Sequence, residues 1–130
     1  MNTAASNIQN VDLFFDTSSA QLSTGAQADL QKLADWAKCS SKNAIILEGH
    51  ADRRGTQNYN LKLSGERAAA VRQQLIDMGV PSERIVVSVF GKNGPAKPTL
   101  AEERRVTIRA SDAPVTPAEL VQVQGASNAG

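Results

Sequence analysis

The chain has 130 residues, with 14 Lys and Arg against 13 Asp and Glu, so its formal net charge is +1. Its 41% hydrophobic and 21% charged residues are typical of one small globular domain and exclude a disordered or collagen-like chain. Aromatic residues make up only 4% of the chain. A nucleic-acid-binding protein usually carries a basic stripe beside aromatic residues, so no nucleic-acid partner is expected.

The single cysteine, Cys39, excludes an internal disulfide framework and a cysteine-based metal site, and neither a metal nor a cofactor is expected. We expect Cys39 to be a small buried residue at the end of a helix. The start of the chain lacks a leader pattern, and no apolar run approaches the length of a membrane span. We therefore expect a soluble fragment without membrane insertion of its own, with any anchor lying before Met1.

The first half of the chain predicts a strand, a helix and a second strand. Residues 8–15 mostly alternate in the period-2 pattern of a strand. Thr24-Gly25-Ala26-Gln27 resembles a capping box, and the apolar spacing that follows predicts a helix to about Lys38. The short apolar run over 44–47 predicts a strand buried on both faces, which ends at 48–50.

The second half predicts one more helix and two more strands. Residues 51–62 are polar and are expected to form the longest surface loop. Ser64 is predicted to cap a helix with Glu66 in its first turn, and Gly79 with Pro81 marks its end. Alternation over 85–89 and 104–110 predicts the last two strands, with a loop over 91–98 between them.

The order β-α-β-α-β-β predicts an α+β fold: a two-layer sandwich in which a small mixed sheet carries both helices on one face. We expect an N-terminal extension over 1–7, the domain over 8–110 and a flexible tail over 111–130. A short docked helix over 117–123 is the less favoured alternative for part of the tail.

Asp52 and Arg67 are the candidate binding residues. Asp52 follows a strand, and Arg67 is placed in the first turn of the predicted second helix. A guanidinium can hold a carboxylate through two parallel hydrogen bonds, helped by the helix N-terminus, while a carboxylate can accept from an ammonium. Such a pocket would recognise a free amino-acid end. The alternative is that Asp52 and Arg67 simply form an ion pair that fastens the loop to the helix.

The order of residues favours the binding interpretation. Residues 49–71 read Gly-His-Ala-Asp-x-x-Gly-x-x-x-Tyr-Asn-x-x-Leu-Ser-x-x-Arg-Ala-x-x-Val. This closely resembles the signature of the OmpA-like C-terminal domain family, and the resemblance extends over roughly a hundred residues, from about Val11 to Val106. It implies non-covalent binding of bacterial peptidoglycan through the diaminopimelate of its stem peptide. It also implies a periplasmic location in a Gram-negative bacterium, as the soluble part of an outer-membrane-anchored protein.

The resemblance also implies roles for individual residues. Asp52 and Arg67 match the principal ligands of diaminopimelate, Asn60 matches a residue that contributes its side-chain amide, and Arg105 matches an arginine near the pocket. Further pocket positions come from the backbone of the segments 16–18 and 52–55, from the position before the aspartate, and from two leucines that form either the pocket floor or the core: Asp16, Ser18, Ala51, Gly55, Leu61 and Leu63.

The chain departs from the family pattern in several places. Ala51 lacks the hydroxyl that many members carry before the aspartate. Glu103 replaces a frequent asparagine, and could weaken the binding of an anionic peptide or pair with Arg104. The loop over 94–102 is short, which puts family contacts from that region in doubt. Arg53-Arg54 is an added basic pair, for which a solvated loop edge is favoured over a ligand contact.

Two competing functions remain at this point. An enzyme would have to use Glu48, His50 and Asp52, which alternate along one strand, but one histidine and one cysteine supply few further catalytic or metal-binding groups. We therefore expect no enzymatic activity, and expect His50 to be a hydrogen-bonded residue at a strand end. The stronger alternative is a module of the same fold that binds envelope proteins, with weak or no binding to the wall.

Overall fold

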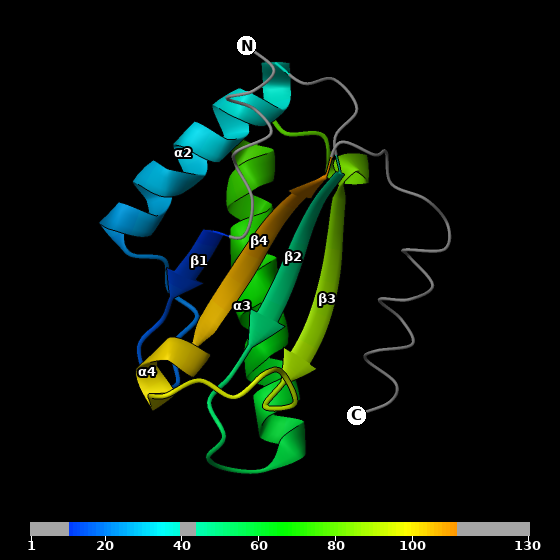
Figure 1. Ribbon diagram of the computed structural model, residues 1–130. Helices are drawn as coiled ribbons and strands as arrows, with labels where there is room; N and C mark the ends of the chain where they lie inside the picture. The colour runs from blue at the N-terminus through cyan, green and yellow to red at the C-terminus, as the bar shows by residue number, and fades with distance from the viewer. Residues whose placement is uncertain (1–10, 40–43, 112–130) are drawn as a thin grey trace.

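The computed structural model describes residues 11–39 and 44–111, which form four strands and two long helices in the order β1, α2, β2, α3, β3, β4 (Figure 1). A 3-10 turn and a one-turn helix lie on either side of β3. The bounds are β1 Val11–Phe14, α2 Thr24–Cys39, β2 Ala44–His50, α3 Gln57–Asp77, the 3-10 turn Ser82–Arg84, β3 Ile85–Gly91, α4 Leu100–Glu103 and β4 Arg105–Ser111.

The strands form one mixed sheet in the order β1-β4-β2-β3. The neighbours β2 and β3 are parallel, as expected for strands joined by a helical crossover, and β4 runs antiparallel to both β1 and β2. The predicted α+β fold with a small mixed sheet is thereby confirmed. Residues 8–10 of the first predicted strand, and the predicted extension and most of the tail, lie outside the described residues.

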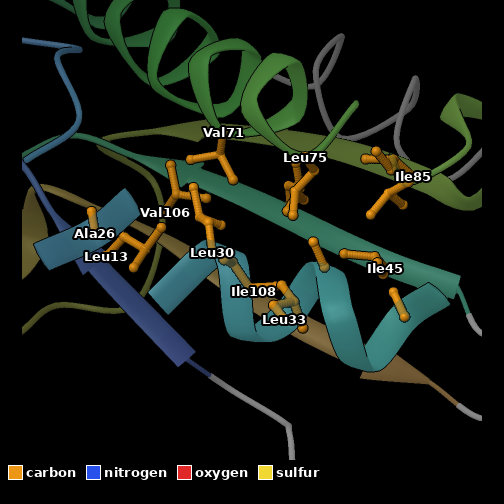
Figure 2. Close-up of a cluster of buried hydrophobic side chains, with 14 of the residues drawn as sticks. Leu13, Ala26, Leu30, Leu33, Ile45, Val71, Leu75, Ile85, Val106 and Ile108 are labelled. Carbon is orange, nitrogen blue, oxygen red and sulfur yellow. The ribbon is translucent and has the colours of Figure 1, made fainter. Parts of the chain in front are cut away.

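One apolar core joins both helices to the sheet. Figure 2 shows Leu30 and Leu33 of α2 and Val71 and Leu75 of α3 meeting side chains of the strands in one cluster. The strand contribution alternates along each strand, as one buried face requires: Leu13, Ile45, Leu47, Ile85, Val106 and Ile108. Burial of this face fixes the register of the sheet, because a slip by one residue would turn these side chains to solvent.

The second helix begins seven residues before the predicted cap. Thr56 is the N-cap, and its hydroxyl accepts from the backbone N–H of Tyr59 at 3.2 Å. Ser64 lies inside the helix, where its hydroxyl donates to the Leu61 carbonyl and accepts from the backbone N–H of Gly91 at 2.9 Å. The prediction of a long loop over 51–62 was therefore wrong, and Arg67 is not in a first turn.

Two local predictions around α2 were also wrong. The helix is capped by Ser23, whose hydroxyl accepts from Ala26 N–H at 3.0 Å, and not by a capping box starting at Thr24. Cys39 ends α2 as predicted, but its side chain is exposed.

The end of β2 lies against the middle of α3, and Gly49 makes this approach possible. A Cβ at Gly49 would overlap the carbonyl of Ser64 and lie 3.2 Å from the Ala68 methyl. The contact brings the chain that follows β2 alongside the first turns of α3. Both segments contribute to the cavity described below.

Gly49→Ala is predicted to destabilise the domain by about 2–3 kcal/mol, because the new methyl group must push β2 away from α3. Gly65→Ala is the control: its Cβ would lie 3.9 Å from Val89, an ordinary contact. Alanine in place of a helical glycine should stabilise by up to about 1 kcal/mol. Urea unfolding followed by circular dichroism measures both. Equal stability of the two variants would contradict the close approach at Gly49.

Candidate functional site

A cavity of about 230 Å³ lies where three segments meet. The segment after β1 contributes Thr17 and Ser18, the turn after β2 contributes Asp52, Arg54 and Gly55, and α3 contributes its inner face. The α3 residues are one aromatic, one amide, one apolar and one cationic side chain: Tyr59, Asn60, Leu63 and Arg67. Segments that are far apart in the sequence thus form one small polar hollow.

Arg67 is a fully buried cation that is held by backbone carbonyls. Its guanidinium donates to the carbonyls of Ser19 at 2.8 Å, His50 at 3.0 Å and Asp16 at 2.9 Å. It also lies over the Phe15 ring, 5.3 Å from the centroid, in a cation–π contact. Burial, with the charge of Arg104 as a smaller cause, lowers the pKa of Arg67 to about 10. The group therefore stays cationic at neutral pH.

Asp52 binds Arg54 and Arg104. Its Oδ1 accepts from the N–H and the Nε of Arg54 at 3.1 and 3.2 Å, and its Oδ2 lies 2.8 Å from Arg54 Nη2 and 3.5 Å from Arg104 Nη1. The hydrogen bonds from Arg54 hold the pKa of Asp52 below its ordinary value, although burial opposes this. Within the described residues, Asp52 and Arg67 form no ion pair with each other, so the simple ion-pair interpretation was wrong.

Asn60 and Tyr59 hold the rim of the cavity. The Asn60 amide donates to the carbonyls of Arg54 at 2.6 Å and Thr56 at 3.0 Å, which closes the turn after β2 onto α3. The Tyr59 hydroxyl donates to Ser18 Oγ at 2.9 Å and so joins α3 to the segment after β1. Ser18 adopts a left-handed φ of 55°, an uncommon conformation outside glycine.

Six of the ten predicted site residues line this cavity: Ser18, Asp52, Gly55, Asn60, Leu63 and Arg67. Asp16 contributes its carbonyl to Arg67 without lining the cavity. Ala51 is buried and does not line the cavity. Leu61 packs against Gly91, so closely that a Cβ at Gly91 would meet its side chain.

Arg105 is not part of the cavity lining. Its guanidinium donates to Thr107 Oγ1 and to the Glu102 carbonyl, at 3.1 and 3.3 Å. Its neighbour Arg104 contacts Asp52 instead. Arg104 is the C-cap of α4, whereas Arg105 is the first residue of β4, so the two neighbouring side chains belong to different elements.

Sequence reasoning missed Tyr59 and Arg104 as neighbours of the site, and it expected only backbone contacts from Thr17 and Arg54. The contact of Arg54 with Asp52 had a signal in the local sequence. In an Asx turn an aspartate accepts from the backbone N–H two residues later, and a glycine such as Gly55 often follows. No comparable signal marked Arg104, which approaches Asp52 only through the pairing of β4 with β2.

Glu103 forms a second charged cluster beside the site, with Arg53. The Glu103 carboxylate is 7% exposed and accepts from Arg53 Nε at 3.1 Å, Arg53 Nη2 at 3.0 Å and the N–H groups of Arg53 and Lys97. Burial opposes its ionisation, but these hydrogen bonds outweigh burial and hold the pKa of Glu103 below its ordinary value of 4.5. Glu103 thus pairs with Arg53, and not with Arg104 as one alternative held.

His50 is buried and stacked. Its ring lies parallel to Phe90 with centroids 5.0 Å apart, and its Nε2 is 3.9 Å from Glu48 Oε1, which is beyond hydrogen-bonding distance. Nε2 has no hydrogen-bond partner among the described residues, while the His50 carbonyl accepts from Arg67 at 3.0 Å. Across residues 11–39 and 44–111, no group of three or more His, Cys, Asp or Glu side chains is placed to hold a metal ion.

The depressed pKa of Glu103 predicts acid destabilisation. Its stabilising contribution is complete above the unfolded-state value of 4.5 and is lost as the pH falls through the lower folded-state pKa. The urea midpoint of the native domain should therefore fall between about pH 5 and about pH 3 more steeply than that of Glu103→Gln. The exposed Glu83 provides the control, and Glu83→Gln should keep the native slope. An identical slope for Glu103→Gln would contradict the role of this carboxylate.

Solved structures share this fold. The crystal structure of the peptidoglycan-associated lipoprotein from Burkholderia pseudomallei aligns with a TM-score of 0.71 and 31% identity, covering 77% of this chain and 89% of that one. The C-terminal domain of Helicobacter pylori MotB aligns with a TM-score of 0.71 over 92% of this chain and 95% of that one. At 18% identity this second likeness concerns the fold alone.

Curated relatives agree in sequence. The peptidoglycan-associated lipoprotein of Mesorhizobium japonicum is 45% identical over 83 residues, which are 64% of this chain and 49% of the relative. Outer membrane porin F of Pseudomonas aeruginosa is 34% identical over 106 residues, 81% of this chain and 30% of that protein. The chain thus spans about half the length, or less, of these relatives. The model of the OmpA family matches residues 14–109, a range that contains every lining residue of the cavity, and the chain belongs to the OmpA family.

Proposed function

We propose that this domain binds peptidoglycan non-covalently and thereby attaches a cell-envelope protein to the wall, with the diaminopimelate of the stem peptide as the group that enters the cavity. The observation that carries the proposal is that a nearly buried carboxylate, Asp52, and a fully buried guanidinium, Arg67, both line one small cavity without binding each other. Family membership and the names of the relatives support the wall as the ligand.

The chemistry of the cavity fits an amino-acid end. Diaminopimelate that is not cross-linked carries a free ammonium and a free carboxylate on one carbon. Arg67 lines the cavity as a cation that no carboxylate of the described residues pairs with, so its charge favours a ligand carboxylate there. Asp52 stays ionised at neutral pH and can accept from an ammonium. The interior of a peptide offers neither charge.

The size of the cavity fits the same ligand. A space of about 230 Å³ accommodates one amino-acid end but is smaller than the 300–1,000 Å³ typical of sites for drug-sized ligands. Recognition would therefore rest on the end of one side chain, while the rest of the peptide and the glycan lies outside. With a net charge of only +1, the chain has no bulk attraction for an anionic polymer, so affinity must come from this cavity.

The relatives named as outer-membrane proteins and lipoproteins support a periplasmic location in a Gram-negative bacterium, at the outer membrane. No described helix has both the length and the apolar character that crossing a membrane requires. The role proposed here is binding without catalysis. The single histidine is buried against Phe90 and is not a lining residue, so it does not face a ligand in the cavity.

Asp52→Asn and Arg67→Lys are each predicted to weaken binding to purified sacculi by about 2–3 kcal/mol, the scale of a charge-assisted buried contact. Lysine is chosen at position 67 because it keeps the buried positive charge, whereas alanine would leave three carbonyls without a donor. Co-sedimentation with sacculi over a protein titration measures binding, and thermal melting checks that each variant folds.

Glu66→Gln is the matched control for Asp52→Asn. Glu66 is an exposed residue of α3, and its substitution removes the same charge without touching the cavity, so binding should stay native. Free meso-diaminopimelate should compete with sacculi for the native domain. Undiminished binding by a folded Asp52→Asn/Arg67→Lys double variant would overturn the cavity as the wall-binding site and would favour a module that binds envelope proteins.

A further inference from the structure

Both oxygens of Asp52 are already bound by a cation of the fold. The Arg54 guanidinium spans the carboxylate, with Nε at 3.2 Å from Oδ1 and Nη2 at 2.8 Å from Oδ2. Arg54 is itself a lining residue of the cavity. A ligand ammonium that approaches Asp52 therefore meets a cation that already holds both oxygens, and it must either share the carboxylate or replace that cation.

Of the three guanidinium groups around Asp52, Arg54 is the one that can leave. Its side chain is 53% exposed, so it can swing into water without losing hydration. Arg104 is 17% exposed and its Nε is bound to the Phe15 carbonyl at 2.9 Å. Arg67 is fully buried and bound to three carbonyls. Moving either of these would break contacts inside the fold, whereas the Arg54 guanidinium is already half in water, where solvent weakens an ion pair.

The turn that carries Arg54 would stay in place after its side chain leaves. The backbone N–H of Arg54 donates to Asp52 Oδ1 at 3.1 Å, and its carbonyl accepts from Asn60 at 2.6 Å. Lys92 Nζ donates to the Gly55 carbonyl at 2.7 Å on the outer side of the same turn. Release of the side chain therefore exposes Asp52 to the cavity without dismantling the turn.

The charge balance favours exchange of one cation for another. Three guanidinium groups lie near the single carboxylate of Asp52, and Arg67 is bound to carbonyls and not to a carboxylate. The carboxylate of a bound ligand would give Arg67 a negatively charged partner. An ammonium on the same ligand can replace Arg54 at Asp52, so the buried carboxylate keeps a partner throughout. A ligand that lacks the ammonium cannot make this replacement.

We propose that Arg54 is an internal competitor for the cation position of the cavity: its side chain holds Asp52 and yields it only to a ligand that brings its own ammonium. This inference rests on the proposed function, because it concerns ligand binding at the same cavity. Its consequence is a lower apparent affinity for a ligand with a free ammonium, since only the fraction of molecules with Arg54 displaced can bind that ammonium at Asp52.

The experiment is calorimetric titration of the native domain, Arg54→Gln and Lys62→Gln with a soluble stem peptide that ends in meso-diaminopimelate. Arg54→Gln should bind about twofold to fivefold more tightly than the native domain, the range expected on removing a competing ion pair whose cation is half exposed. Lys62 is an exposed residue of α3, and Lys62→Gln removes the same charge, so it should bind as the native domain does. The same peptide acetylated on its free amine should show no gain with Arg54→Gln.

The outcomes separate the two proposals. No binding of the peptide by the folded native domain would overturn the proposed function and the inference with it. Native binding that is unchanged in Arg54→Gln would overturn only the inference, because Arg54 would not then compete for Asp52. Weaker binding by Arg54→Gln would also overturn it, and would make Arg54 a residue that holds the ligand. An equal gain in Lys62→Gln would show a general charge effect and would overturn it as well.

Discussion

The burial of one guanidinium organises this end of the domain. Arg67 carries a charge into a position with no exposed surface, and three backbone carbonyls compensate it. Two of these carbonyls belong to the segment after β1 and the third to the last residue of β2. Because a buried charge is costly unless its donors are satisfied, α3, the end of β2 and the segment after β1 must stay together. The cavity lies at this junction.

The two adjacent arginines after β2 have opposite roles. Arg53 reaches the nearly buried Glu103, together with the backbone N–H of Lys97, and so ties the turn to the chain that precedes β4. Arg54 turns to Asp52 at the cavity. Both side chains are half exposed, and both carboxylates are nearly buried. The two carboxylates differ in position: Glu103 is enclosed by the fold, whereas Asp52 lines the cavity where a ligand would bind.

The helix start illustrates why a sequence pattern can mislead. Thr56 and Ser64 are both residue types that cap helices, and the residues between them are largely polar. An apolar stripe marks only the part of α3 that lies on the core, at Ala68, Val71 and Leu75. The first turns line the cavity instead, so their inner face carries polar groups such as Asn60. The sequence of a helix whose first turns carry polar residues toward a cavity therefore resembles that of a loop.

By itself the sequence determined the fold class and the mixed sheet, because alternation and apolar spacing reflect burial. It also determined most of the cavity lining, because the motif from Gly49 to Ala68 contains most of the lining residues. Only the tertiary structure decided which charges meet. Asp52 binds Arg54 and Arg104 while Arg67 binds carbonyls, and Arg105 binds Thr107 and Glu102 outside the cavity lining. Ion pairing depends on distances of a few ångströms between separate segments, and strand pairing and helix packing set those distances.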